Sequence, residues 1–240
     1  MIAGGLLGGA SYEMTEVVEF TKTNSTPFYG RLPFAQYGAV GTMFGNTPIL
    51  CGGRDAYSFD TCISYDQNSE WIQSNSMVEA RVEAAAVKVN STTFWILGGY
   101  DHGGDDSSYL GSTEFIIQDQ INGVPGPILP YGLCSMCAIK ISKNEIFVVG
   151  GWDGPSLRNE VWIYDPQNGF ARTQGPSLNT ARRDHSCSTM RNGEKTLIVV
   201  AGGFNSNYGL LDSVEIYDPT DNTWHLGKNK FPTAKILISI

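Results

Sequence analysis

Pairs of adjacent glycines recur along the chain at nearly equal intervals, and each pair directly follows an apolar run. The steps between successive pairs are 48, 46, 52 and 52 residues. A fixed period of this length indicates an array of one repeated supersecondary unit. The five pairs are Gly4-Gly5, Gly52-Gly53, Gly98-Gly99, Gly150-Gly151 and Gly202-Gly203.

The residues between the glycine pairs predict four short β-strands in each repeat. A β-branched or aromatic run follows each pair after about 8 to 15 residues, and in three repeats it ends in Tyr-Asp, which is typical of a strand ending at a turn. In the same repeats a large aromatic residue comes next. No segment has a convincing helical period, so we predict an all-β fold. The recurring aromatic residues are Tyr65, Trp71, Tyr164, Phe170, Tyr217 and Trp224.

The segment before each glycine pair is apolar at consecutive positions, as in Trp95-Ile96-Leu97. A strand of this kind is buried on both faces, between neighbouring sheets. Two glycines at its end indicate a place where no Cβ fits or where φ is positive. Four-stranded sheets repeated radially form a β-propeller, and this is the architecture we predict.

A glycine pair followed by Tyr-Asp-Pro and then a tryptophan resembles the Kelch repeat. The fourth and fifth repeats match it best, with Tyr164-Asp165-Pro166 and Tyr217-Asp218-Pro219. The first and third repeats depart from it, with Phe20 and Ile117 at the tyrosine position. The resemblance covers essentially the whole chain. It implies a single Kelch-type β-propeller domain over residues 1–240.

Both ends of the chain have strand-like sequences. The first glycine pair begins at Gly4, and the last residues, 234–240, form an apolar run where the first strand of a further repeat is expected. If this run pairs with residues 1–5, both ends complete one blade and the ring has five four-stranded blades. Kelch propellers more often have six or seven blades, so the alternative is a piece of a longer propeller.

The charge of the chain narrows the classes of partner. Its net charge is −8 and its pI is about 4.8, and it has no basic run longer than Arg182-Arg183. Nucleic acid and anionic membrane surfaces are therefore not expected as partners. No stretch of 18 apolar residues occurs, so we expect no membrane insertion.

The five cysteines leave the redox state open. Cys51 and Cys62 lie on successive predicted strands, where a disulfide is geometrically possible. Cys134 and Cys137 form a C-x-x-C sequence, but on a strand they point to opposite faces, and no second pair completes a zinc site. We therefore expect buried, reduced thiols, which favour a cytoplasmic location and leave an extracellular one open.

Two Asn-x-Ser/Thr sequences begin at Asn24 and Asn90. Sequences of this kind are acceptors for N-linked glycans in secreted proteins. The chain is rich in Asn, Ser and Thr, so chance alone readily supplies two of them. They do not by themselves indicate a location.

The loops after the glycine pairs are the predicted binding surface. They open on the same rim as the loops that link one blade to the next, and function is often carried by loops on a rigid scaffold. Tyr, Trp and Arg dominate the energetics of protein binding. The alternative for Tyr100, Trp152 and Phe204 is a structural role against the next blade. The predicted partner-binding residues are Arg54, Tyr57, Tyr100, Tyr109, Trp152, Arg158, Arg182, Arg183, Phe204 and Tyr208, with Arg31 and Arg81 on the same rim.

The acidic residues and histidines of the chain suggest two further alternatives, a metal site and an enzyme. Asp101, His102, Asp105 and Asp106 could hold Ca²⁺, but an exposed polar turn explains the same residues, so no metal and no cofactor are expected. Some Kelch propellers resemble galactose oxidase, whose copper is held by tyrosines and histidines. Only His102, His185 and His225 occur here, at different strand positions, and no catalytic triad stands out. We therefore expect no enzymatic activity.

These observations predict a protein-interaction module. A partner loop or peptide is expected to insert aromatic or acidic side chains among Arg54, Arg158, Arg182 and Arg183. The alternative is a galactose-oxidase-like or carbohydrate-binding propeller. Exposed aromatic residues beside Asp or Asn are typical of a carbohydrate site, and Trp152-Asp153 and Phe204-Asn205 partly fit that pattern.

Overall fold

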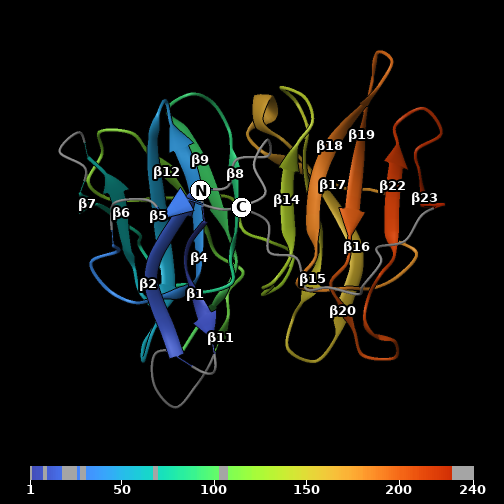
Figure 1. Cartoon of the computed structure of the whole chain (residues 1–240). Helices are drawn as coiled ribbons and strands as arrows, with labels where there is room; N and C mark the ends of the chain where they lie inside the picture. Colours follow the sequence, from blue (N-terminus) through green and yellow to red (C-terminus); the bar gives the residue numbers. More distant parts are fainter. Residues whose placement is uncertain are drawn as a thin grey trace. The chain divides into compact units, whose positions relative to one another are not determined.

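The computed structural model describes residues 31–66, 70–102 and 108–228, and the backbone of residues 2–7, 10–17 and 26–27. Contacts divide the chain into two compact units, one that ends at Leu129 and one that begins at Pro130. Within the described ranges both units consist of antiparallel strands, and the one helix is a 3-10 turn at Pro166–Asn168 (Figure 1). The predicted all-β class is therefore confirmed. No helix in this part of the chain has the length and hydropathy to cross a bilayer.

The first unit contains a three-stranded sheet, two four-stranded sheets and a short hairpin. The three-stranded sheet has the order β1-β2-β3, one four-stranded sheet has the order β4-β5-β6-β7, and the other has the order β13-β12-β9-β8. The strands are β1 (Ile2–Leu7), β2 (Ala10–Val17), β3 (Thr26–Pro27), β4 (Tyr37–Phe44), β5 (Thr47–Arg54), β6 (Thr61–Tyr65), β7 (Trp71–Ser76), β8 (Ala85–Lys88), β9 (Thr93–Leu97), β12 (Thr113–Ile117) and β13 (Val124–Pro125), with the hairpin of β10 (Tyr100–Asp101) and β11 (Ser108–Tyr109).

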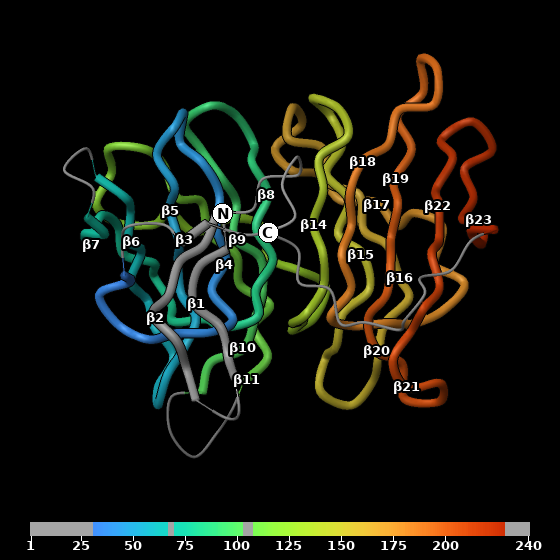
Figure 2. Tube along the Cα trace, viewed as in Figure 1, coloured from blue at the N-terminus to red at the C-terminus, as the bar shows by residue number. Residues whose placement is uncertain are grey.

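The second unit contains two four-stranded sheets, of order β14-β15-β16-β17 and β18-β19-β22-β23, and a short hairpin. Figure 2 allows each sheet to be followed as a series of antiparallel hairpins. The strands are β14 (Cys137–Lys140), β15 (Ile146–Trp152), β16 (Leu157–Asp165), β17 (Ala171–Gln174), β18 (Ser186–Asn192), β19 (Lys195–Ala201), β22 (Val214–Asp218) and β23 (Thr223–Leu226), with the hairpin of β20 (Phe204–Asn205) and β21 (Gly209–Leu210).

Several four-stranded antiparallel sheets, each with its glycine pair at the end of the second strand, agree with Kelch blades. The number of blades and the closure of a ring stay predictions. The run predicted to complete the first blade, residues 234–240, lies outside the described residues.

The glycine pairs lie where a backbone segment that leads into a first strand comes close. Gly52 and Gly53 have φ of 69° and 83°. A Cβ on Gly52 would lie 2.4 Å from the carbonyl oxygen of Arg81. In the second unit, a Cβ on Gly203 would lie 2.5 Å from the carbonyl oxygen of Arg183. Both steric space and a positive φ therefore require glycine at these positions.

Five of the six recurring aromatic residues pack in the core, and Phe170 is half-buried in the turn after the 3-10 helix. Tyr217 and Trp224 are partners across β22 and β23, with ring centres 5.4 Å apart, and both are buried. Tyr65 and Trp71 form the corresponding pair across β6 and β7, at 5.5 Å. Tyr164 is buried in the same way. Each of these side chains contributes about 1.5–3 kcal/mol of hydrophobic stabilisation when it leaves water.

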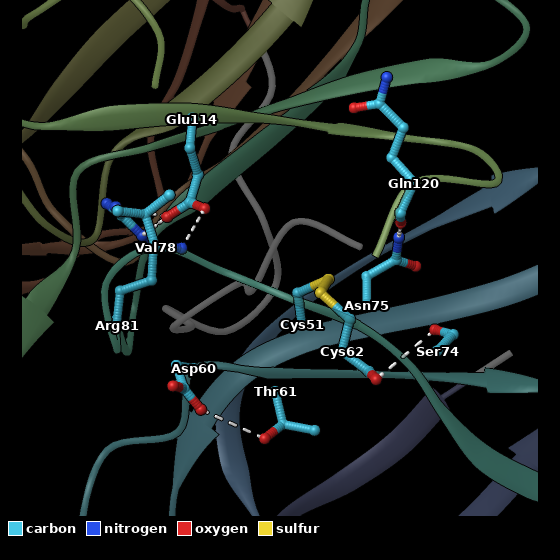
Figure 3. The surroundings of a disulfide bond; sticks show 10 residues. All are labelled: Cys51, Asp60, Thr61, Cys62, Ser74, Asn75, Val78, Arg81, Glu114 and Gln120. Atoms are coloured by element: carbon cyan, nitrogen blue, oxygen red, sulfur yellow. Dashed lines mark hydrogen bonds and ion pairs between the residues drawn. A yellow bond between two sulfur atoms is a disulfide. The ribbon is translucent and has the colours of Figure 1, made fainter. Parts of the chain in front are cut away.

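Four of the five cysteines form disulfides, so the expectation of reduced thiols is wrong for them. Cys51 and Cys62 are register partners on β5 and β6, with Cα atoms 4.0 Å apart (Figure 3). Cys137 and Cys187 lie on the first strands of the two sheets of the second unit and are 50 residues apart in sequence. Cys134 is buried and belongs to neither bond. The second disulfide joins two sheets, so spacing within one repeat did not predict it.

Candidate functional site

In three repeats, backbone hydrogen bonds hold the residue after the glycine pair against the loop that precedes a first strand. Tyr100 and Val82 exchange two such bonds, of 2.9 and 3.0 Å. Trp152 with Cys134 and Phe204 with Arg183 repeat the arrangement, at 2.9–3.2 Å. In these repeats the two loops therefore lie at the same end of the sheet. We call this end of each sheet the rim.

In the second unit, Arg183 lies between two aromatic rings of the rim. Its guanidinium carbon is 4.9 Å from the ring centre of Trp152 and 5.2 Å from that of Phe204. Its Nη1 atom is 3.3 Å from Oδ2 of Asp184. The Arg183 side chain keeps 30% of its surface exposed. Cation–π contacts therefore hold an accessible positive charge and two apolar faces in one fixed group.

Arg158 forms a second part of the rim. Its guanidinium carbon lies 4.6 Å from the ring centre of Tyr131, and its Nε donates to Oδ2 of Asp153 at 2.9 Å. The hydrogen bond to Asp153 raises the pKa of Arg158. Asp153 is itself fixed, because its Oδ1 accepts the backbone N–H of Ser156 at 2.7 Å. The cation is therefore permanent, but one carboxylate already neutralises part of it.

Arg182 does not lie on the rim surface, which corrects the prediction for this residue. Its side chain is 0% exposed, and Nη2 lies 2.7 Å from Oε1 of Glu215, which is also 0% exposed. Nη1 donates to the carbonyl oxygen of Gly202 at 2.9 Å. Successive residues of an extended segment point to opposite sides, so Arg183 faces outward while Arg182 faces the interior. Arg182 is therefore unavailable to a partner.

Arg81 is corrected in the same way. Its Nη2 lies 2.8 Å from Oε1 of Glu114, and both side chains are buried. The other carboxylate oxygen of Glu114 accepts the backbone N–H of Val78 at 2.7 Å (Figure 3). Arginine and glutamate are 33 residues apart in both pairs, with the glutamate at the second position of the third strand. That recurrence was the sequence signal for the pairs.

The first unit presents another group of rim residues. The guanidinium carbon of Arg54 lies 5.9 Å from the ring centre of Tyr37, which sequence reasoning did not single out. The rings of Tyr100 and Tyr109 are 6.4 Å apart across the β10–β11 hairpin. Burial raises the pKa of the Tyr100 hydroxyl. Tyr57 is 71% exposed, so its ring needs no rearrangement to meet a partner.

Tyr208 is 73% exposed in the turn between β20 and β21. Asn205 fixes this turn from beneath, because its Oδ1 accepts the backbone N–H of Asn207 at 2.9 Å and that of Tyr208 at 3.3 Å. The Nδ2 atom of Asn205 donates to the carbonyl oxygen of Ala181 at 2.6 Å. An exposed ring on an anchored turn suits recognition.

The candidate metal-binding and catalytic residues have different surroundings. Asp105 and Asp106 lie outside it, and the described residues contain no group of three potential metal ligands. His102 donates its backbone N–H to Ser58 Oγ at 2.9 Å. His185 is buried, and desolvation lowers its pKa to about 3. His225 is exposed and contacts Asp221 at 2.7 Å. Arg31 is exposed.

Comparisons with known proteins agree with the repeat structure. The Kelch motif matches residues 133–169 and 195–230. Kelch-like protein 23 of Mus musculus and that of Homo sapiens are each 26% identical to this chain over 208 residues, which is 82% of the chain. The matched region is 33% of each relative, so the chain spans about a third of the length of these curated proteins.

Proposed function

We propose that this chain, which contains Kelch motifs and is distantly homologous to Kelch-like protein 23 over most of its length, binds a partner protein through its rim loops. The observation that carries the proposal is the Trp152–Arg183–Phe204 group. Its three side chains are of types that concentrate binding energy in protein interfaces. They are held by backbone bonds and cation–π contacts, so binding costs little additional side-chain entropy.

The partner we propose offers acidic or aromatic side chains. Arg183 and Arg158 supply partly exposed cations in the second unit, and Arg54 supplies one in the first. Carboxylates complement these groups, and aromatic rings complement the exposed Tyr57 and Tyr208. Arg182 is not part of the proposed surface, because its charge is already paired in the interior.

Carbohydrate binding is the less favoured alternative. A sugar site needs an accessible aromatic face with free polar groups beside it. Arg183 lies over both Trp152 and Phe204, and Asp153 is paired with Arg158. The side-chain amide of Asn205 bonds the backbone of Asn207, Tyr208 and Ala181. These contacts favour a protein partner over a sugar. We propose no enzymatic activity and no cofactor.

Affinity capture with mass spectrometry tests the proposal. The wild-type chain is compared with the double variant Arg183→Ala and Tyr208→Ala, and with Arg191→Ala as a control. Arg191 is exposed near the end of β18, beside the β18–β19 turn and away from the rim. Proteins retained by wild type and by the control, and lost by the double variant, would support the rim. Equal retention by all three chains, with unchanged thermal melting, would contradict it.

We also propose that residues 1–240 form one closed five-bladed propeller. The support is the repeat period and the four-stranded sheets that follow it. A closed ring unfolds as one cooperative unit, so the calorimetric and van't Hoff enthalpies of unfolding should agree. Two separate transitions would contradict a single domain, and a crystal structure would settle the number of blades.

A further inference from the structure

The turn between β8 and β9 carries the sequence Asn90-Ser91-Thr92, and all three residues are exposed. We infer that Asn90 is an acceptor for an N-linked glycan. The sequence pattern alone is weak, because it arises readily by chance. Two independent structural features raise it above chance: the geometry of the turn and the disulfides of the chain.

The turn brings the acceptor side chain to the hydroxyl of the same sequence. Oδ1 of Asn90 accepts the backbone N–H of Thr92 at 2.9 Å and the Thr92 hydroxyl at 3.2 Å. The turn is closed by the backbone, since the N–H groups of Val89 and Asn90 both donate to the carbonyl oxygen of Thr93. Among the described residues, no hydrogen bond uses Nδ2 of Asn90. A substituent on this nitrogen therefore disturbs no contact that holds the hairpin.

The disulfides point to the compartment in which this modification occurs. Cys51–Cys62 lies in the same unit as Asn90, and Cys137–Cys187 joins two sheets of the other unit. Disulfides form and persist in the secretory pathway and outside the cell, and they are rare in the cytosol. Glycans are attached to Asn-x-Ser/Thr sequences of secreted chains. The expectation of a cytoplasmic location rested on reduced thiols, and the two bonds remove that support.

The reaction uses a lipid-pyrophosphate-linked oligosaccharide as donor. Nδ2 of Asn90 forms a bond to the anomeric carbon of the sugar and loses one proton. The bond from that carbon to the phosphate oxygen breaks, and the lipid pyrophosphate leaves with the bonding electrons. The glycan then lies at the β8–β9 turn, at the opposite end of β9 from Gly98-Gly99 and Tyr100. It therefore leaves the rim of this sheet uncovered.

The test expresses the full chain behind a cleavable export leader in eukaryotic cells, followed by glycosidase treatment and peptide mass spectrometry. We expect a glycan on the peptide that contains Asn90. Asn90→Gln and Thr92→Ala should each remove one mobility step, whereas Thr92→Ser should keep it, because serine retains the hydroxyl. Asn24 lies outside the described residues. All variants are therefore also made in an Asn24→Gln background, so that a glycan on Asn24 is not mistaken for one on Asn90.

Glycosylation precedes export, so chains retained inside the cell are analysed in the same way. Recovery of the Asn90 peptide only in unmodified form would overturn the inference. A second readout is alkylation of the natural protein under denaturing conditions without reductant. We expect Cys51, Cys62, Cys137 and Cys187 to resist alkylation. If all four react, the chain does not fold where disulfides form, and the inference fails on that ground.

Discussion

Arg182 and Glu215 form an ion pair in which both side chains are fully buried and the closest nitrogen and oxygen atoms are 2.7 Å apart. Glu215 also accepts the backbone N–H groups of Asn179 and Thr180, at 2.7 and 3.0 Å. The pair thus joins the third strand of its sheet to the segment that leads into the first. Buried charges of this kind are tolerated only while every partner is in place.

Arg182→Met should reduce the free energy of unfolding by about 3–5 kcal/mol, because Glu215 is left as an unpaired buried charge. Arg183→Met is the matched control and should cost about 1 kcal/mol, the worth of its exposed cation–π contacts. Urea unfolding followed by tryptophan fluorescence gives both values. Similar losses in the two variants would contradict the different burial of these neighbours.

Removing both charges should not restore full stability. In Arg182→Met with Glu215→Met, the backbone N–H groups of Asn179 and Thr180 lose their acceptor. A buried donor without a partner costs about 1–3 kcal/mol. We expect the double variant to unfold between wild type and Arg182→Met in urea. Stability equal to wild type would mean that Glu215 serves only to neutralise Arg182.

Trp152→Ala should weaken binding of a captured partner at least tenfold, which corresponds to about 1.4 kcal/mol. The ring packs on Arg183, so its loss removes both an apolar face and the support of a cation. Titration calorimetry or surface plasmon resonance with the captured partner measures the change. Arg191→Ala should leave the affinity unchanged. An unaltered affinity in Trp152→Ala would remove this ring from the binding surface.

Stability should fall as the pH is lowered, and His185 should account for much of the fall. Desolvation lowers its pKa to about 3 in the folded state, from an ordinary value of 6.5. Between these values the unfolded chain binds a proton that the folded chain does not, so acid favours unfolding. The stabilising contribution is present above pH 6.5 and is lost toward pH 3. About 2 kcal/mol should disappear between pH 7 and pH 5.

His185→Gln should flatten this pH dependence, and His225→Gln should not, because His225 is exposed. The free energy of unfolding in urea at several pH values provides the comparison. If His185→Gln folds too poorly to measure, the imidazole signals of the wild-type chain can be followed by NMR between pH 7 and pH 4. A His185 signal that titrates near pH 6.5 in the folded protein would contradict the burial.

The Cys137–Cys187 bond should stabilise the chain by about 4 kcal/mol, as expected for a 50-residue separation. The Cys51–Cys62 bond spans 11 residues and should contribute about 3 kcal/mol. Paired serine variants at each site, compared by thermal melting with and without reductant, check these values. Reductant should lower the melting temperature of the Cys137→Ser, Cys187→Ser variant less than that of the Cys51→Ser, Cys62→Ser variant, because the first retains only the weaker bond. Equal sensitivity in wild type and both variants would contradict bonded cysteines.

The repeat period was sufficient to predict the all-β class, the four-stranded sheets and the places of the glycine pairs. These features depend on contacts within one repeat or on the backbone, and both recur with the same period as the sequence pattern. The repeat pattern did not predict which of Arg182 and Arg183 is buried. They are adjacent and chemically alike, and only the side to which each residue of the segment points decides which one is buried.

The repeat pattern also did not predict the contacts between repeats. Cys137 and Cys187 occupy the first strands of successive repeats, and their pairing depends on how two sheets pack. Tyr37 and Tyr131 take part in cation–π contacts with rim arginines, yet neither occupies a recurring sequence position that we recognised. Spacing identifies equivalent positions, but it does not identify which of them touch.

The residue after the glycine pair is fixed to its neighbour through its main chain in three repeats, as Tyr100, Trp152 and Phe204 show. Its side chain contributes nothing to these hydrogen bonds. Substitutions at such a position change what the surface displays while the scaffold beneath is kept. The side chain at each of these positions can therefore be exchanged without loss of the backbone hydrogen bonds. A library randomised only at these positions would vary the specificity of a chain that still folds.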